Sequence, residues 1–303
     1  MTISVDDAVA CLMEHPDYRV LKRLDPESVG GPALTQGTVR RAAIIDTETT
    51  GMDSKTDRII EIGIVVFEYA AETGEIGPVV GHLSALEDPE RPIPPEAIAV
   101  HHITDEMVKG TRFDDAAVAQ LLEGVGLVIA HNASFDRPFV EARFPLFTDL
   151  HWACSLREVG WRDLGYASAA LEFLAYRTGF FYDGHRAEID CRALLAVLAR
   201  PLGERTAAPA LNTLLDHARE KTFKVSALNS PFESKDVLKG RGYRWEPDGK
   251  VWALELDAIN LDAELAYLKE KIYGGANAEV QLETQDARVR YSERKGQIER
   301  TSV

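Results

Sequence analysis

Two acidic residues stand two positions apart at the end of an apolar run. Asp46 and Glu48 follow the letters AAII in the segment DTETTG. Residues i and i+2 of a strand project to the same face, so we expect the two carboxylates to lie close together. Two bare carboxylates raise each other's pKa and cost stability, whereas a divalent cation binds both in their charged form. The alternative interpretation is an ordinary acidic turn before a glycine.

Further stretches of the chain have residues of related chemistry. Asp136 lies in HNASFDRPF, on the first turn of a helix expected after the buried strand LVIAH. His185 precedes Asp190 by five positions in HRAEID, near another expected helix start. Glu96 and His101 lie in IPPEAIAVHHIT. Each is weak alone, because an acidic residue near a helix N-terminus is usually a cap or a dipole partner. Together with Asp46 and Glu48, and in this order along the chain, these residues form a specific pattern.

These residue types meet the needs of phosphodiester hydrolysis. The reaction requires an attacking hydroxide and stabilisation of the departing 3′ oxygen, and two metals about 4 Å apart can supply both. Hard ions such as Mg²⁺ and Mn²⁺ prefer all-oxygen ligands. Histidine has an unperturbed pKa of about 6.5, so it can accept the proton of the water at neutral pH. The residues therefore predict metal-dependent hydrolysis.

The motifs IIDTETTG, HNASFD and HRAEID resemble those of a known family. They are similar to the 3′–5′ exonucleases of the type found in the proofreading (epsilon) subunit of bacterial DNA polymerase III. Ribonuclease T and oligoribonuclease belong to the same superfamily, DEDDh, which is named for four acidic residues and a histidine. The resemblance covers residues 41–200, and the spacing from His185 to Asp190 matches the histidine branch, not the tyrosine branch.

The resemblance implies a fold and a set of ligands. The fold is α/β and ribonuclease-H-like, with a mixed five-stranded sheet flanked by helices. His185 would be the general base. Two divalent metals, Mg²⁺ or Mn²⁺, would be held in each active site by Asp46, Glu48, Asp136 and Asp190.

Further positions match substrate contacts of the family near the terminal nucleotide. We expect the substrate to contact Thr47, Glu96, His101 and Asn132. Asn132 is also expected to cap the following helix, supported by His131. One departure is visible, because the family often reads VHGI where this chain reads VHHI, so His102 replaces a glycine.

The order of expected elements predicts an α/β domain followed by a smaller one. The runs AAIID, RIIEIGIVVFEY, VVGHLSAL and LVIAH indicate strands, and ASFDRPFVEARF, LEFLAYRTGFF and RAEIDCRALLAVLAR indicate helices. We expect an N-terminal helix-and-strand extension, the exonuclease domain, a linker, a small α+β C-terminal module and a polar, loose tail. Their boundaries are placed at residues 1–40, 41–200, 201–211, 212–275 and 276–303.

The C-terminal module combines basic and aromatic residues. Residues 219–244 contain seven Lys and Arg against three Asp and Glu, a local charge of +4. Basic side chains follow phosphates and aromatic faces stack on bases, so a nucleic-acid patch is one interpretation, and a small domain whose core needs its aromatics is the other. The stretch also resembles a small module appended to some DNA-processing proteins. The patch would comprise Lys235, Lys239, Arg241, Arg244, Trp245 and Trp252.

Composition limits the alternatives. The net charge of −15 over 303 residues argues against coating nucleic acid by bulk electrostatics. Three separated cysteines without a CxxC pair favour a reducing compartment. There is no signal-peptide pattern and no run of 18 apolar residues, which predicts a cytoplasmic protein without a membrane partner.

The sequence thus predicts a metal-dependent 3′–5′ exonuclease that releases 5′-mononucleotides from single-stranded or frayed DNA, in repair or turnover. RNA 3′-end trimming is the alternative, because recognition of the 2′-hydroxyl depends on details of the pocket. A catalytically inactive nucleic-acid-binding protein is the alternative of another class. DNA or RNA 3′ ends are the expected partners. A polymerase or clamp partner is not indicated, and the resemblance is compatible with a homodimer.

Overall fold

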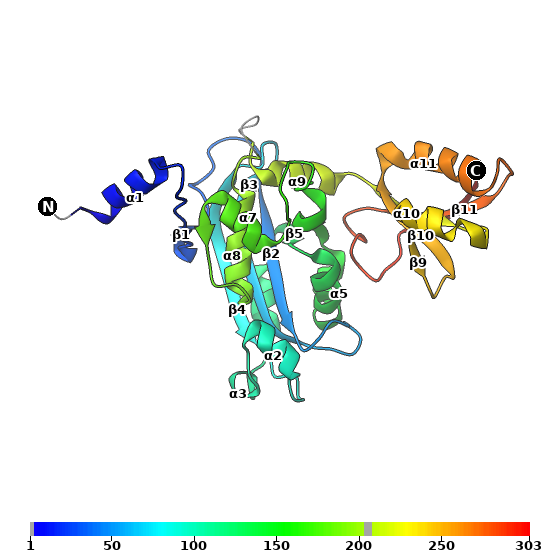
Figure 1. The fold of residues 1–303 in the computed structure, drawn as a ribbon. Helices are drawn as coiled ribbons and strands as arrows, with labels where there is room; N and C mark the ends of the chain where they lie inside the picture. Colours follow the sequence, from blue (N-terminus) through cyan, green and yellow to red (C-terminus); the bar gives the residue numbers. More distant parts are fainter. Residues whose placement is uncertain (1–2, 203–207) are drawn as a thin grey trace.

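The computed structural model describes residues 3–202 and 208–303, and its centre is a five-stranded sheet (Figure 1). The strand order is β4-β3-β2-β5-β6. β2, β3 and β4 are antiparallel neighbours, whereas β5 and β6 run parallel to β2. This mixed sheet confirms the expected fold class. The strands are β2 Val39–Thr49, β3 Ile59–Ala70, β4 Ile76–Leu86, β5 Val125–Ala130 and β6 His151–Cys154.

Helices cover both faces of this sheet, because its central strand is apolar on both sides. Ala42 and Ile44 of β2 face the core under α7, α8 and α9, while Ala43 and Ile45 face the core under α4 and α5. Within the described residues, no helix is long and apolar enough to span a membrane. These helices are α4 Asp115–Leu121, α5 Ala133–Arg143, α7 Leu171–Thr178, α8 Ala187–Leu198 and α9 Ala210–Arg219. The connections contain α2 Pro95–His101, α3 Asp105–Val108 and α6 Ser155–Glu158.

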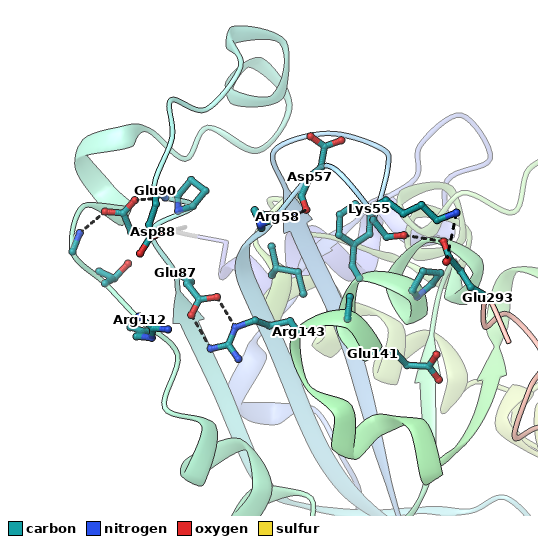
Figure 2. A pocket seen from close by; sticks show the side chains of 18 residues that line it. Lys55, Asp57, Arg58, Glu87, Asp88, Glu90, Arg112, Glu141, Arg143 and Glu293 are labelled. Atoms are coloured by element: carbon teal, nitrogen blue, oxygen red, sulfur yellow. Dashed lines mark hydrogen bonds and ion pairs between the residues drawn. The ribbon is translucent and has the colours of Figure 1, made fainter.

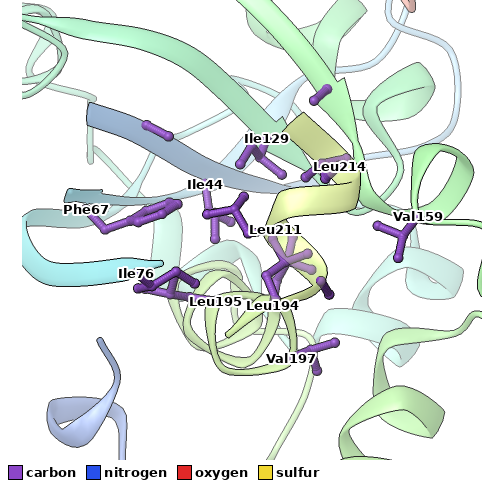
Figure 3. Packing of buried hydrophobic residues seen from close by; sticks show 14 of the residues in the cluster. Ile44, Phe67, Ile76, Ile129, Val159, Leu194, Leu195, Val197, Leu211 and Leu214 are labelled. Carbon is purple, nitrogen blue, oxygen red and sulfur yellow. The ribbon is translucent and has the colours of Figure 1, made fainter. Parts of the chain in front are cut away.

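Helix α9 completes the first of these cores. Figure 3 shows its Leu211 and Leu214 beside Leu194 of α8 and Ile44 of β2. The boundary expected between residues 211 and 212 is therefore wrong, because it cuts a helix that packs in the exonuclease domain. Of the expected linker 201–211, residues 203–207 lie outside the described part of the chain, and Pro201 pairs with Pro209 through an isolated bridge.

The N-terminal extension contains a helix and a very short strand. Helix α1, Val5–Glu14, begins after Ser4, whose side chain accepts a hydrogen bond from Asp7 N–H, and it buries none of its residues. The strand expected in this extension is limited to β1 Lys22–Arg23, which pairs in parallel with β7 Phe180–Phe181. A 3-10 turn follows at Pro26–Ser28.

The C-terminal domain is an antiparallel sheet with the order β12-β11-β8-β10-β9. Val225, Leu238, Leu268 and Val280 belong to its core. Its strands are β8 Thr222–Ala227, β9 Arg244–Glu246, β10 Val251–Asp257, β11 Glu279–Gln285 and β12 Gln297–Ser302. Its helices are α10 Lys235–Gly240 and α11 Leu261–Tyr267, which continues as a π turn through Leu268–Ile272.

The segment 276–303 differs from the loose tail that its composition predicts. It supplies β11, which pairs with β8 in the centre of the sheet, and β12, which forms one edge. Val280 and Leu282 alternate into the core, and the remaining side chains are mostly polar. Backbone hydrogen bonds hold an edge strand in place, so it needs few apolar side chains. Its composition can therefore resemble that of a loose tail.

A glycine brings α8 against the sheet. Gly63 of β3 pairs with Asp46 of β2, and the N-terminal end of α8 lies directly over it. A Cβ atom at residue 63 would lie 2.2 Å from the carbonyl carbon of Ala187 and 2.3 Å from the nitrogen of Glu188. Any larger side chain would push the helix away from the strand that contains Asp46.

We predict that Gly63→Ala lowers the free energy of unfolding by about 1–3 kcal/mol, because the methyl group overpacks against backbone atoms. Urea unfolding measures the change. Gly126→Ala is the matched control, since Gly126 also lies in a strand of this sheet and a Cβ atom there would have no neighbour within 4 Å. Equal stabilities of the two variants would contradict the close packing of α8.

Candidate active site

Three carboxylates converge between β2 and α8. Oxygen atoms of Asp46, Glu48 and Asp190 all lie within 4.8 Å of one another. Asp46 and Glu48 share the face of β2 that α8 covers, as Ala42 and Ile44 do, which is the alternation of a strand. The expected proximity of the first two is confirmed, and the fold adds the third from α8.

An ion pair between the exposed Arg186 and a buried glutamate fixes the start of α8 beside these carboxylates. Glu61 of β3 pairs with Glu48 across the sheet and is fully buried. Its carboxylate accepts hydrogen bonds from the Arg186 guanidinium at 2.9 and 3.1 Å, and from Ala187 N–H at 3.1 Å. Since α8 begins at Ala187, this contact and Gly63 together determine where the helix places Asp190.

Each oxygen of the Asp190 carboxylate has a donor. The Tyr182 hydroxyl donates to one oxygen and Arg186 N–H donates to the other, both at 3.1 Å. Burial raises the pKa of Asp190, while the hydrogen bond from Arg186 N–H and that from Tyr182 oppose the shift. The two donors fix the orientation of this carboxylate through neutral groups.

Asp136 reaches the same region from α5, which begins beyond the end of β5. It is 3% exposed, and it does not belong to the three residues whose oxygen atoms lie within 4.8 Å of one another. One of its oxygens accepts from both Thr47 N–H, at 3.1 Å, and the Thr47 hydroxyl, at 2.8 Å. Thr47 was expected to contact substrate. In the structure both of its hydrogen-bond donors orient Asp136 instead, because Thr47 faces α5 while Asp46 and Glu48 face α8.

The electrostatics of the cluster favour a bound cation. Burial first, and then the charges of Asp136 and Asp190, raise the pKa of Asp46 well above its ordinary value. Burial and the nearby Asp190 raise the pKa of Glu48 to about 8. Burial raises the pKa of Asp136 to about 7, although the Thr47 hydrogen bonds oppose this. Buried oxygen ligands that repel one another suit a hard divalent metal, so the donor set fits such an ion.

His185 lies on the loop between β7 and α8. It is exposed and has φ of +63°, in the left-handed region. The charge of His185 and a hydrogen bond from its backbone oppose the rise in the pKa of Asp190, so the two residues are neighbours. His185 is therefore a solvent-exposed neighbour of the carboxylate cluster, and its role as a base stays a prediction.

The VHHI segment ends α2. His101 is 2% exposed, and its Nδ1 accepts from Ile103 N–H at 3.0 Å, whereas its Nε2 has no partner among the described residues. Burial lowers the pKa of His101. His102 caps the helix with φ of +60°, a conformation that glycine adopts without cost. His102, in place of the glycine of VHGI, therefore keeps the same turn with a strained backbone. Glu96 is exposed on the first turn of α2.

Asn132 occupies the N-cap position of α5 but makes no side-chain cap hydrogen bond. The expected cap position is therefore confirmed, but without a side-chain hydrogen bond to the helix. Its exposed amide oxygen accepts from the Ser134 hydroxyl at 3.0 Å instead. His131 behind it is structural, as expected: its ring nitrogens contact Ser155 Oγ and Ala169 O, both at 2.8 Å, and burial lowers its pKa to about 4.

The six residues of the predicted nucleic-acid patch are not equivalent. Trp245 is 49% exposed and contacts the half-buried Trp252 edge-on, with ring centroids 5.7 Å apart. Arg241 pairs with the buried Glu264 at 2.8 Å and lies 3.6 Å from the Tyr267 ring centroid. Arg241 is therefore a packing residue of the domain, because Glu264 needs its charge. The exposed members include Lys235, Lys239 and Arg244.

Several residues of the site have no place in the sequence prediction. Glu61 and Tyr182 hold the α8 end of the cluster, and Gly63 allows the helix to approach. A signal existed for Glu61, because it is an acidic residue in the middle of the apolar run RIIEIGIVVF, and a buried charge needs a partner. Tyr182 has no such pattern around it.

A surface depression lies outside the carboxylate cluster and is lined in part by α5 (Figure 2). Its volume is about 930 Å³, and none of the predicted metal ligands lines it. Across it, Arg143 of α5 forms a two-pronged ion pair with Glu87 at 2.7 and 2.8 Å. Glu293 of the C-terminal domain approaches Lys55 at its rim, at 3.7 Å. The depression is thus lined by ion pairs that join parts of the fold, and it is separate from the carboxylate cluster.

Comparison with known proteins gives matches over the exonuclease region. The family described as Exonuclease matches residues 43–198. DNA polymerase III subunit epsilon of Treponema pallidum (strain Nichols) is 32% identical over 189 residues, 59% of this chain and 83% of that protein. Exodeoxyribonuclease 10 of Escherichia coli (strain K12) is 29% identical over 198 residues, 60% of this chain and 83% of that protein. Solved exonuclease X in complex with 5′ overhanging duplex DNA is 26% identical, with a TM-score of 0.41 over 58% of this chain and 98% of that chain.

Without metal, we predict that the free energy of unfolding falls as pH rises from about 5 to about 8. The pKa of Glu48 rises from 4.5 to about 8 on folding, so in this window the folded state holds more protons than the unfolded chain. Raising the pH then favours unfolding, by at most about 1.4 kcal/mol for each unit of pKa shift. Urea unfolding in EDTA across this range measures the slope.

Glu48→Gln is the control, because it removes one titrating group and should flatten the profile. Added Mg²⁺ or Mn²⁺ should stabilise the wild type most at high pH, since the ion binds the charged carboxylates. A flat wild-type profile in EDTA would contradict the crowding of the cluster.

Proposed function

We propose a substrate and a product for this chain, which belongs to the exonuclease family and is a 3′–5′ exonuclease. It releases 5′-mononucleotides from the 3′ ends of single-stranded or frayed DNA. The convergence of Asp46, Glu48 and Asp190 supports this most directly. The chain supplies three oxygen ligands within 4.8 Å, from the end of one strand and the first turn of one helix. No other group of three or more potential ligands occurs among the described residues.

The proposed cofactor is Mg²⁺ or Mn²⁺, two ions per active site, held by Asp46, Glu48, Asp190 and Asp136. When bound, such ions would activate water and stabilise the departing 3′ oxygen. The protein's part is to keep the ligands in place. Thr47 orients Asp136 through two hydrogen bonds, and Tyr182 and Arg186 orient Asp190.

His185 is proposed to accept the proton of the attacking water. Its exposure and its position next to Asp190 support this role, because a base must reach solvent and stand beside the reacting phosphate. His185 has a left-handed backbone and lies on a short loop. The next residue of this loop, Arg186, is held by its ion pair with Glu61. The ion pair is therefore a positioning contact for the base.

The substrate contacts remain proposals. Nε2 of the buried His101 is proposed to bind a nucleotide oxygen, because Nδ1 already accepts from Ile103 N–H and, among the described residues, only the Thr49 backbone lies near the other ring nitrogen. Exposed Asn132 and Glu96 are free to approach the terminal nucleotide. A substrate contact of Thr47 would have to use atoms other than its N–H and hydroxyl hydrogens, which Asp136 already accepts.

DNA is the proposed substrate because the two curated relatives are named for DNA polymerase III and for an exodeoxyribonuclease. RNA 3′-end trimming is the second candidate, since the carboxylate cluster acts on the phosphodiester that both polymers share. A cytoplasmic location and a homodimer are proposed from the sequence alone.

The exposed part of the C-terminal patch is proposed to bind single-stranded nucleic acid. Trp245 offers an aromatic face for a base, and Arg244, Lys235 and Lys239 offer charge for phosphates. Arg241 is left out of this proposal because Glu264 already binds it.

We predict that Asp190→Asn lowers the rate of nucleotide release by about three orders of magnitude or more while the fold stays near intact, because one metal ligand loses its charge. The assay follows 5′-labelled DNA and RNA strands with Mg²⁺, Mn²⁺ or EDTA. A metal-dependent ladder that shortens from the 3′ end, absent in the variant, is the expected result, and the better-cleaved strand identifies the sugar.

His185→Asn is the matched variant, since asparagine tolerates the left-handed backbone but cannot act as a base. It should slow the reaction by about 10²–10⁴-fold and leave Mn²⁺ binding unchanged. Full activity of Asp190→Asn would refute the ligand assignment. No ladder from the wild type on any strand would favour the inactive binding protein.

We predict that Trp245→Ala weakens binding of a single-stranded oligonucleotide by about 1–3 kcal/mol, the contribution of one stacked base. Fluorescence anisotropy in EDTA measures affinity without cleavage. Tyr18→Ala is the control, because Tyr18 is 59% exposed in the N-terminal extension. If both variants bind as the wild type does, the aromatic pair serves the domain's own packing or binds protein.

A further inference from the structure

The segment between β11 and β12 leaves the C-terminal sheet and packs on the exonuclease domain. We call residues 286–295 the bridging loop. Its Ala287 carbonyl accepts from Trp152 N–H at 2.8 Å, which extends the hydrogen bonding of edge strand β6. The loop is thus joined to the backbone of the central sheet, and its other contacts start from this fixed point.

The strongest contact is a buried cation next to a proposed metal ligand. Arg137 of α5 directly follows Asp136, and it is fully buried. Its guanidinium donates to the carbonyls of Arg290, at 2.6 Å, and Arg288, at 2.5 Å, with Ala287 O at 3.2 Å. Its Nε donates to Glu141 one turn along α5, at 2.8 Å. A buried guanidinium without such partners is costly, so α5 needs the bridging loop to satisfy Arg137.

A second set of contacts holds the same helix at its surface. Ser292 Oγ donates to Glu141 at 2.6 Å, and Arg294 donates to Glu141 at 3.1 Å and to Thr148 O at 2.8 Å. Glu141 therefore joins Arg137, Ser292 and Arg294. Glu141 binds Arg137, which adjoins Asp136, so these contacts restrain the first turn through Arg137 even though Pro138 interrupts the hydrogen bonds of the helix.

The bridging loop also contacts the segment that follows β2. Glu293 accepts from the Ser54 hydroxyl at 3.3 Å and pairs with Lys55 at 3.7 Å, as Figure 2 shows for Lys55. These two residues lie a few positions beyond Glu48. One loop of the C-terminal domain thus contacts both the helix with Asp136 and the turn that follows β2.

Contacts of Arg290 and Tyr291 hold the loop itself. Arg290 is 4% exposed and pairs with Glu158 of α6 at 2.5 Å. It also donates to Glu220 O, just after α9. The Tyr291 hydroxyl donates to the same Glu158 at 2.8 Å. A loop anchored on three sides cannot move freely, which is the property that a support for a metal ligand requires.

We propose that the bridging loop is a positioning element of the metal site, which fixes α5 and thereby Asp136, so that the C-terminal domain is part of the catalytic unit. The inference rests on the proposed function in one respect, that Asp136 is a metal ligand. Removal of residues 212–303 would take away the partners of Arg137 and most of α9, so a defect in such a variant would not report substrate binding alone.

Arg294→Ala tests the proposal, because Arg294 is half-exposed and its removal leaves no cavity in the core. We expect the dissociation constant for Mn²⁺, measured by calorimetry without nucleic acid, to rise at least about threefold. We also expect faster hydrogen exchange of α5 amides with β3 amides unchanged. Arg300→Ala is the matched control, an exposed arginine of β12 whose partner Glu279 lies in the same domain. It should behave as the wild type.

A loop that only joins two domains would give a different result: lower thermal stability of Arg294→Ala, with Mn²⁺ affinity and α5 exchange as in the wild type. That result would overturn the proposal. Arg137→Lys is the second variant, which keeps the charge and loses the planar fork. It should shift both quantities further, and if it does not fold, Arg294→Ala decides alone.

The two readouts separate this inference from the proposed function. Neither uses nucleic acid, so a protein that cleaves no strand but shows the expected shifts would fail only as a nuclease. Absence of Mn²⁺ binding to the wild type would refute the proposed metal site, and α5 exchange would then decide whether the loop positions the helix.

Discussion

Repulsion among carboxylates at one place in the sheet is the constraint on which the surrounding structure depends. Glu61 lies opposite Glu48, and Asp136 and Asp190 are near enough to Asp46 to raise its proton affinity. The chain neutralises only Glu61, through Arg186. The other acidic groups receive hydrogen bonds from neutral donors, or from none, and so retain the oxygen atoms that a cation would bind.

The rest of the site follows from the need to hold these groups together. Gly63 removes the side chain that would separate α8 from the sheet, and the Arg186 ion pair ties the first turn of that helix to β3. On the other face, Thr47 connects β2 to α5 through Asp136. Alternation along a single strand thus distributes the ligands: two residues face one helix, and the residue between them orients the ligand on the other.

Sequence patterns predicted the parts that depend on periodicity. The apolar runs and helical spacings located the central sheet and its helices, and the period of two placed Asp46 and Glu48 together. Contacts between distant segments left no such pattern. Arg137 and its carbonyl partners are about 150 residues apart, and backbone carbonyls have no residue identity to recognise. Segment 276–303 was misjudged for a related reason, because strands held by backbone pairing need few apolar side chains. Arg241 looked like a surface cation because Glu264, its partner, lies 23 positions away.

The distance along the chain between Arg137 and the bridging loop has a consequence for biosynthesis. Domains generally fold in order from the N-terminus as they emerge from the ribosome. Here helix α5 is made early, but the carbonyls that satisfy Arg137 are among the last residues described. A nascent chain therefore has every proposed catalytic residue outside the exit tunnel before α5 can reach its final packing. On the proposed role of the bridging loop, the metal site is completed only after residues 286–295 have been made, about 150 residues after α5.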